Sequence, residues 1–171
     1  MQKASSAPKP VDVKIEAKAT DGSVWNPNNY FWEEKNYEKW GTEWLKQLLN
    51  EFKHSIFGGE LEITSVDDLK GTCGVSIRKG KKICSFDYSV KLKWKLGLVD
   101  GAGTEVAKVE GEFHFPEISN LVYDDGDKFE INVNYTAGEE HRPWLDPIMK
   151  SEVSDHLRAS IEEFIWELKE K

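Results

Sequence analysis

The segment from Arg78 to Lys82 holds four cations and one glycine, with no apolar side chain. Guanidinium and ammonium groups donate hydrogen bonds and carry charge, so they recognise carboxylates or exposed backbone carbonyls on a partner. Lys79-Gly80 is a candidate two-residue hairpin turn, because glycine adopts positive φ without strain. The sequence therefore predicts a cationic hairpin tip. The alternative interpretation is a solvated loop tip without a function of its own.

Residues that could catalyse a reaction or bind a metal show no recognisable pattern. The four histidines are isolated from any H-E-x-x-H motif, and the sequence has no G-x-S-x-G motif or P-loop. Cys73 and Cys84 are not part of a C-x-x-C pair. Glu139-Glu140-His141 could bind a metal, but a solvated charge run is the simpler interpretation. We expect no enzyme activity, no cofactor and no metal, and a protein that acts through its surface.

The charge of the chain is unevenly distributed. The formal net charge is −8, but the segment from Arg78 to Lys95 has a net charge of +6, which leaves −14 for the rest. This distribution argues against a general polyanion binder and favours steering of an acidic partner to one place. Lys91, Lys93 and Lys95 are interpreted as a solvated sheet face, with Glu110 and Glu112 as cross-strand partners.

A long strand dominates the centre of the chain. From Cys84 to Leu98 apolar residues occupy every second position, which is the period of a β-strand. Residues 72–77 are predicted to pair back on it through the turn, which places the two cysteines diagonally and leaves both thiols free. Further strands are predicted at residues 60–65, 106–115 and 129–135. Asp67 to Gly71 is interpreted as a turn, and the meander has about four strands.

Two helices flank this meander. The first is predicted from Tyr37 to Phe57, with Asn36 as N-cap and Gly58-Gly59 as its end. The second begins at Asp146 as N-cap, with Pro147 at its first position, and its apolar stripe runs to Leu168. Helices outside an antiparallel sheet define an α+β fold. Residues 1–23 are expected to form a flexible extension and residues 24–171 a single domain.

An asparagine-rich and aromatic segment precedes the first helix, at Trp25–Trp32. One interpretation is a turn whose aromatic side chains anchor it to the core. The other is an exposed recognition segment, because amphipathic aromatic side chains are common at interfaces.

Three motifs together resemble the N-terminal domain of the activators of the 90-kDa heat-shock chaperone ATPase. They are N-P-N-N-Y-F-W at 26–32, R-K-G-K at 78–81 and S-V-K-L-K-W at 89–94. The resemblance covers roughly residues 25–170 and implies an elongated α+β domain. It also implies a co-chaperone that binds the middle segment of the chaperone and stimulates its ATPase.

The resemblance assigns roles to individual residues. In the family, the basic turn remodels the catalytic loop of the chaperone, which maps onto Arg78, Lys79 and Lys81, with Lys82 extending the charge. The family motif N-x-N-N-W-H-W is tied to efficient stimulation and is matched by Asn26, Asn28, Asn29 and Trp32. Tyr30 and Phe31 replace the family tryptophan and histidine. Larger members carry a further C-terminal domain.

The expected partner is therefore the 90-kDa chaperone, and the expected location is cytoplasmic. The N-terminus lacks the apolar run of a signal peptide, and no stretch has the ~20 apolar residues of a membrane span. We expect a monomer that binds neither nucleic acid nor membrane. Two alternatives remain open: a nucleic-acid-binding module that uses the same basic hairpin, and an unrecognised hydrolase.

Overall fold

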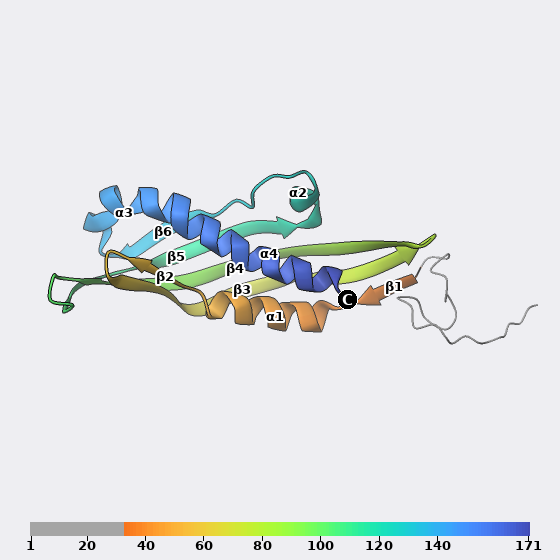
Figure 1. Cartoon of the computed structure of the whole chain (residues 1–171), viewed down its shortest axis with the longest axis horizontal. Helices are drawn as coiled ribbons and strands as arrows, with labels where there is room; N and C mark the ends of the chain where they lie inside the picture. The colour runs from red at the N-terminus through yellow and green to blue at the C-terminus, as the bar shows by residue number, and fades with distance from the viewer. Residues whose placement is uncertain (1–32) are drawn as a thin grey trace, which may run out of the picture.

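A computed structural model describes residues 33–171 as one antiparallel sheet with helices on one face (Figure 1). The meander consists of β3 (Gly59–Arg78), β4 (Lys81–Val99), β5 (Glu105–Ser119) and β6 (Asn132–Ala137). Two short strands, β1 (Glu33–Asn36) and β2 (Lys53–Ile56), also pair with β3. The sheet thus has six strands among the described residues, and the predicted number of about four is too low. The α+β class is confirmed.

The strand count differs because β3 is continuous over twenty residues. The turn predicted at residues 67–71 is an irregularity within this strand, where the register with β4 shifts between Asp67 and Lys70. Asp68 adopts a φ of 49° there, so one left-handed residue absorbs the extra length without ending the strand. A strand of this length offers one edge to two short partners, with β2 beside residues 59–62 and β1 beside residues 74–77.

The first helix, α1 (Glu38–Asn50), is shorter than predicted. Residues 53–56 form β2, in which exposed Lys53 and Ser55 alternate with His54 and Ile56. Phe52 and Ile56 are four residues apart, a spacing that continues a helical stripe but also fits period-two alternation. Pairing with β3 selects the strand. The predicted N-cap is wrong by one position, since Tyr37 precedes the helix directly and makes no side-chain cap. The Asn36 side chain nevertheless supports the start of the helix, because its Oδ1 accepts a 2.7 Å hydrogen bond from the Glu38 amide.

The C-terminal helical segment begins earlier than predicted. It consists of α3 (Arg142–Ile148), one π-helical turn at Met149–Val153 and α4 (Ser154–Lys169). Asp146 is therefore inside a helix and not its N-cap, and Pro147 is not at the first position. Pro147 has no N–H to donate to the preceding turn, and the π turn follows directly after α3, where the regular hydrogen-bond pattern is interrupted. The predicted apolar stripe is confirmed, because every residue in it is buried: Met149, Val153, Leu157, Ile161, Phe164, Ile165 and Leu168.

The core lies between the sheet and helices α1 and α4, which run along one face (Figure 1). Phe164 of α4 contacts Trp40 of α1 and Tyr88 of β4, with ring centroids 5.8 Å apart in both pairs. The opposite face carries the lysines of β4. Lys93 lies opposite Glu112 and Lys95 opposite Glu110, as predicted, and the Lys93 Nζ lies 3.6 Å from a carboxylate oxygen of Asp67. No helix within residues 33–171 is both long and apolar enough to cross a bilayer.

Candidate partner-binding site

The predicted cationic hairpin is present at the joined ends of β3 and β4. Arg78 and Lys81 form its last pair, and the two residues between them have positive φ, 51° at Lys79 and 79° at Gly80. This is the pattern of a type I′ turn, which matches the twist of the flanking strands. Arg78, Lys79 and Lys81 are exposed. The two strands therefore present three cations at one end of the sheet.

Lys82 differs from the other three predicted cations. It is half-buried, and its Nζ donates a 3.0 Å hydrogen bond to the backbone carbonyl of Lys169, at the end of α4. The last carbonyls of a helix have no partner within the helix and attract cations. Lys82 therefore joins the hairpin to the C-terminal helix, whereas the other three cations face solvent.

The end of α4 brings further cations close to the hairpin, which the sequence did not indicate. The Lys169 Nζ lies 4.8 Å from the centroid of the Tyr123 ring, and the Lys171 Nζ lies 4.2 Å from the centroid of the Trp40 ring. Both are cation–π contacts that orient the ammonium groups. Ile83, next to Lys82, is 49% exposed and adds an apolar side chain. The only sequence feature that could have indicated these cations is the presence of Lys169 and Lys171 at the end of the predicted C-terminal helix.

The predicted asparagine–aromatic site precedes the part of the chain that the structure describes. Asn26, Asn28, Asn29 and Trp32 lie outside the described residues, as does the predicted extension at residues 1–23. Glu33 is the first residue described, and it pairs with Ile77, one position before Arg78. The chain enters the sheet beside the base of the cationic hairpin. The sequence did not predict β1, so it gave no reason to expect this proximity.

The other titratable side chains that the structure describes are spread over the fold. Within residues 33–171, no three His, Cys, Asp or Glu side chains are grouped to hold a metal ion. Cys73 and Cys84 are free thiols, as predicted, and burial raises the pKa of both. Burial likewise raises the pKa of Tyr88, whose hydroxyl lies 3.4 Å from that of Thr42. Glu140 and His141 are in contact with solvent, and the His141 Nε2 lies 3.9 Å from a carboxylate oxygen of Glu140.

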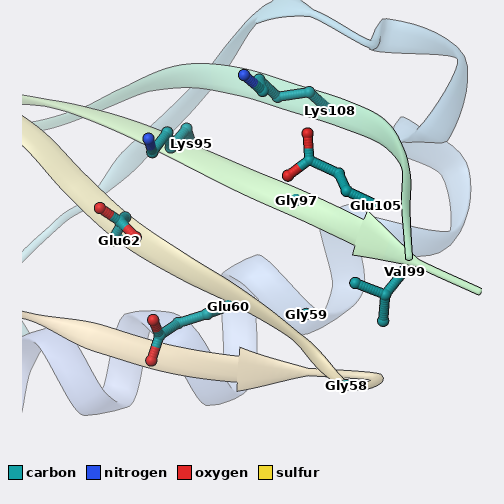
Figure 2. Close-up of a pocket in the computed structure, with 9 residues that line it drawn as sticks. All are labelled: Gly58, Gly59, Glu60, Glu62, Lys95, Gly97, Val99, Glu105 and Lys108. Atoms are coloured by element: carbon teal, nitrogen blue, oxygen red, sulfur yellow. The ribbon is translucent and has the colours of Figure 1, made fainter. Parts of the chain in front are cut away.

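A pocket lies on the lysine-bearing face of the sheet, near the turn between β2 and β3 (Figure 2). It has a volume of about 250 Å³ and is lined by Gly58, Gly59, Glu60, Glu62, Lys95, Gly97, Val99, Glu105 and Lys108. The cationic hairpin does not contribute to it. The hairpin instead presents three exposed cations at the tip of two paired strands.

A long antiparallel meander, helices on one face and a cationic hairpin at one end define an α+β domain with an exposed basic tip. Residues 34–171 match the family described as "Activator of Hsp90 ATPase, N-terminal". The chain belongs to this family.

Individual relatives agree with this assignment. The human protein named "Activator of 90 kDa heat shock protein ATPase homolog 1" is 34% identical over 145 residues, which is 84% of this chain and 40% of that protein. Among solved structures, Aha-1 from Plasmodium falciparum is 26% identical with a TM-score of 0.67, covering 80% of this chain and 88% of that one. The human Aha1 N-terminal domain is 29% identical with a TM-score of 0.57, covering 78% and 93%. The chain thus spans about 40% of the length of its first curated relatives.

Proposed function

We propose that this protein is a co-chaperone that binds the middle segment of the 90-kDa heat-shock chaperone and stimulates its ATPase. The observation that carries this proposal is the cationic hairpin tip, in a chain that belongs to the activator family. Arg78, Lys79 and Lys81 contact the catalytic loop of the chaperone and remodel it. The chain has no catalytic role of its own in this proposal.

The fold suits the hairpin tip to this task. Two long paired strands hold the turn, so its three exposed cations have little backbone freedom to lose when they bind. An activator must bind the active arrangement of its partner more tightly than the resting one, since equal affinity shifts no equilibrium. Cations on a stiff hairpin supply this difference in affinity if the catalytic loop of the chaperone presents acidic groups or carbonyls to them only in the active arrangement.

We further propose that Asn26, Asn28, Asn29 and Trp32 take part in stimulation. Support comes from their match to the family motif and from the pairing of Glu33 with Ile77, which starts the described chain beside the hairpin. Lys82 contributes mainly by holding the hairpin against α4. The protein acts as a monomer in the cytoplasm, consistent with two free thiols.

The test is the ATPase rate of the cognate 90-kDa chaperone with and without this protein. We expect a clear rise at low salt that fades at high salt, because exposed charge contacts are screened. The double variant Arg78→Ala/Lys79→Ala removes two cations from the tip and should lose most of the stimulation. Lys39→Ala/Lys46→Ala is the matched control, since both lysines are exposed on α1 and the charge change is the same.

Binding to the isolated middle segment is measured in parallel. Stimulation that survives in the Arg78→Ala/Lys79→Ala variant would contradict the role of the hairpin tip. Neither binding nor stimulation by the unaltered protein would contradict the proposed function as a whole. A gel-shift assay at physiological salt should show no complex with nucleic acid, because the net charge is −8.

A further inference from the structure

Phe57 is the most exposed large apolar side chain among the described residues, with 76% of its surface accessible. It occupies the first position of the two-residue turn between β2 and β3, where Ile56 pairs with Gly59. Phe57 and Gly58 have φ values of 47° and 85°. Turns of this kind favour asparagine, aspartate or glycine, and a bulky residue with positive φ is an outlier. Such strain persists mainly where the side chain has a function.

The exposed ring is held in a defined position. Its centroid lies 5.8 Å from that of Trp144, in α3. The Trp144 Nε1 in turn donates a 3.2 Å hydrogen bond to the Nδ1 of His141. Trp144 remains 38% exposed, so both rings present surface to solvent. Aromatic side chains fixed before binding lose little conformational entropy when a partner covers them, and they are enriched among residues that dominate binding energy.

The pocket described above begins at the next residue, Gly58 (Figure 2). Three of its lining residues are glycines, namely Gly58, Gly59 and Gly97, and they allow close approach of Val99, of the β4 backbone and of Glu105 respectively. The side chain of Glu105 lies across Gly97, since a methyl group built on that glycine would be 2.6 Å from a Glu105 carboxylate oxygen. The aromatic pair and the pocket thus meet at one turn.

The charges around this turn favour a cationic partner. Glu60, Glu62 and Glu105 line the pocket together with Lys95 and Lys108. Lys95 lies opposite Glu62 on β3 and Glu110 on β5, so its charge is offset within the sheet. Near Trp144 in the sequence, the exposed Glu139 and Glu140 precede the His141 that holds its ring, and the exposed Arg142 follows it. Among these residues, the five carboxylates therefore outnumber the three cations.

We propose that the end of the molecule formed by Phe57, Trp144 and the adjacent pocket is a docking surface for a protein segment with an apolar side chain next to a lysine or arginine. The apolar side chain covers the Phe57–Trp144 pair, and the cationic side chain enters the pocket toward Glu60 and Glu105. This surface is separate from the cationic hairpin tip, because the twenty residues of β3 lie between them and span up to roughly 60 Å. The inference does not depend on the proposed function.

The test is an NMR titration of the labelled full chain with a synthetic peptide that has a central leucine between two lysines in a glycine–serine background. We expect saturable shifts of the Trp144 indole N–H, assigned with Trp144→Phe, and of the Gly58 amide. The matching peptide with glutamate in place of lysine should produce none. The variant Glu60→Gln/Glu105→Gln should bind the lysine peptide more weakly, and the affinity of this variant should depend less on salt.

Phe57→Asn separates binding from folding, because asparagine relaxes the turn while removing the ring. We expect roughly tenfold weaker peptide binding, with a melting temperature that is unchanged or raised. Trp166→Ala is the matched control, since Trp166 is also exposed, at 60%, but lies on α4. It should leave peptide affinity unchanged.

Three outcomes would overturn the proposal: no saturable shift with the lysine peptide, equal shifts with the glutamate peptide, or full affinity in Phe57→Asn. A lowered melting temperature in Phe57→Asn would also overturn it. The contact between Phe57 and Trp144 would then stabilise the fold by holding the turn against α3. The Arg78→Ala/Lys79→Ala variant should bind the peptide normally, which keeps this result independent of the hairpin tip.

Discussion

Lys82 in β4 donates a 3.0 Å hydrogen bond from its ammonium group to the backbone carbonyl of Lys169, the last residue of α4. The bond joins the base of the cationic hairpin to the end of the C-terminal helix. It satisfies a carbonyl that has no partner within the helix and places a positive charge at the negative end of the helix dipole. Lys82 is therefore a supporting residue for the hairpin tip.

Lys82→Ala should lower the free energy of unfolding by about 0.5–1.5 kcal/mol, the usual net value of one such hydrogen bond. Arg78→Ala should change it little, because Arg78 is exposed. The measurement is urea unfolding of both variants beside their ATPase stimulation. We expect Lys82→Ala to lose less stimulation than Arg78→Ala. Unchanged stability with abolished stimulation would instead place Lys82 in direct contact with the partner.

Lys79 resembles Phe57 in its backbone, because each is an exposed residue with positive φ at the first position of a two-residue turn. Lys79→Asn replaces it with a residue that tolerates this conformation better. We expect a melting temperature that is unchanged or slightly raised and a clear loss of ATPase stimulation. Such a result would show that Lys79 makes the turn less stable than asparagine would and that its charge is needed for stimulation. A lowered melting temperature with full stimulation would contradict it.

The sequence predicted correctly those parts of the fold whose residue pattern is compatible with only one kind of secondary structure. The alternation from Phe86 to Leu96 in β4 is reproduced in its burial, because successive side chains of a strand must leave on opposite faces. Gly80 indicated a two-residue turn at Lys79-Gly80. A turn at this position sets the register in which β3 and β4 pair. The boundaries were wrong where local signals are ambiguous. Asp67 and Asp68 favour a turn, but they are part of an irregularity within β3.

The candidate site was predictable only in its local part. The exposure of Arg78, Lys79 and Lys81 follows from a short turn made only of cations and glycine. The bond from Lys82 to Lys169 joins residues far apart in the sequence, and no sequence pattern marks it. Phe57 was assigned to the end of a helix, so its place in a strained turn against Trp144 could not be expected.

Gly41 in α1 shows how packing can override helix propensity. It is buried, and a methyl group built on it would clash with the Sγ of Cys73 and lie 2.7 Å from the Tyr88 hydroxyl. Alanine is favoured over glycine within a helix by about 0.5–1 kcal/mol, whereas overpacking a core costs about 1–3 kcal/mol. Gly41→Ala should therefore destabilise the protein, by about 1 kcal/mol.

A double-mutant cycle identifies the cause of this loss. In a Cys73→Ala background the Sγ is gone, so Gly41→Ala should cost less there than in the unaltered protein. Chemical unfolding of the four proteins gives the coupling free energy. If Gly41→Ala raises stability in both backgrounds, helix propensity dominates and the close approach of α1 to β3 is not limiting.

Asp146 links stability to pH. Its Oδ1 accepts a 2.9 Å hydrogen bond from the Tyr135 hydroxyl, and its Oδ2 lies 2.9 Å from the Lys150 Nζ. Burial alone would raise the pKa of Asp146, but the contacts with Lys150 and Tyr135 outweigh it and lower this pKa on balance. A carboxyl whose pKa is lower in the folded state stabilises the fold above its unfolded pKa, and that contribution is lost as the pH falls through the folded pKa.

Asp146→Asn should therefore lower the free energy of unfolding at pH 7, by about 1–2 kcal/mol for a charged hydrogen-bonded group. The difference from the unaltered protein should shrink as the pH falls below the unfolded pKa of about 3.9. Urea unfolding at several pH values measures this. Asp155→Asn is the control, because Asp155 is exposed and its ion pairs with Lys128 and Arg158 are worth about 1 kcal/mol at most. A pH-independent difference for Asp146→Asn would mean that the Asp146 side chain stabilises the fold through its shape and neutral hydrogen bonds, and its charge does not contribute.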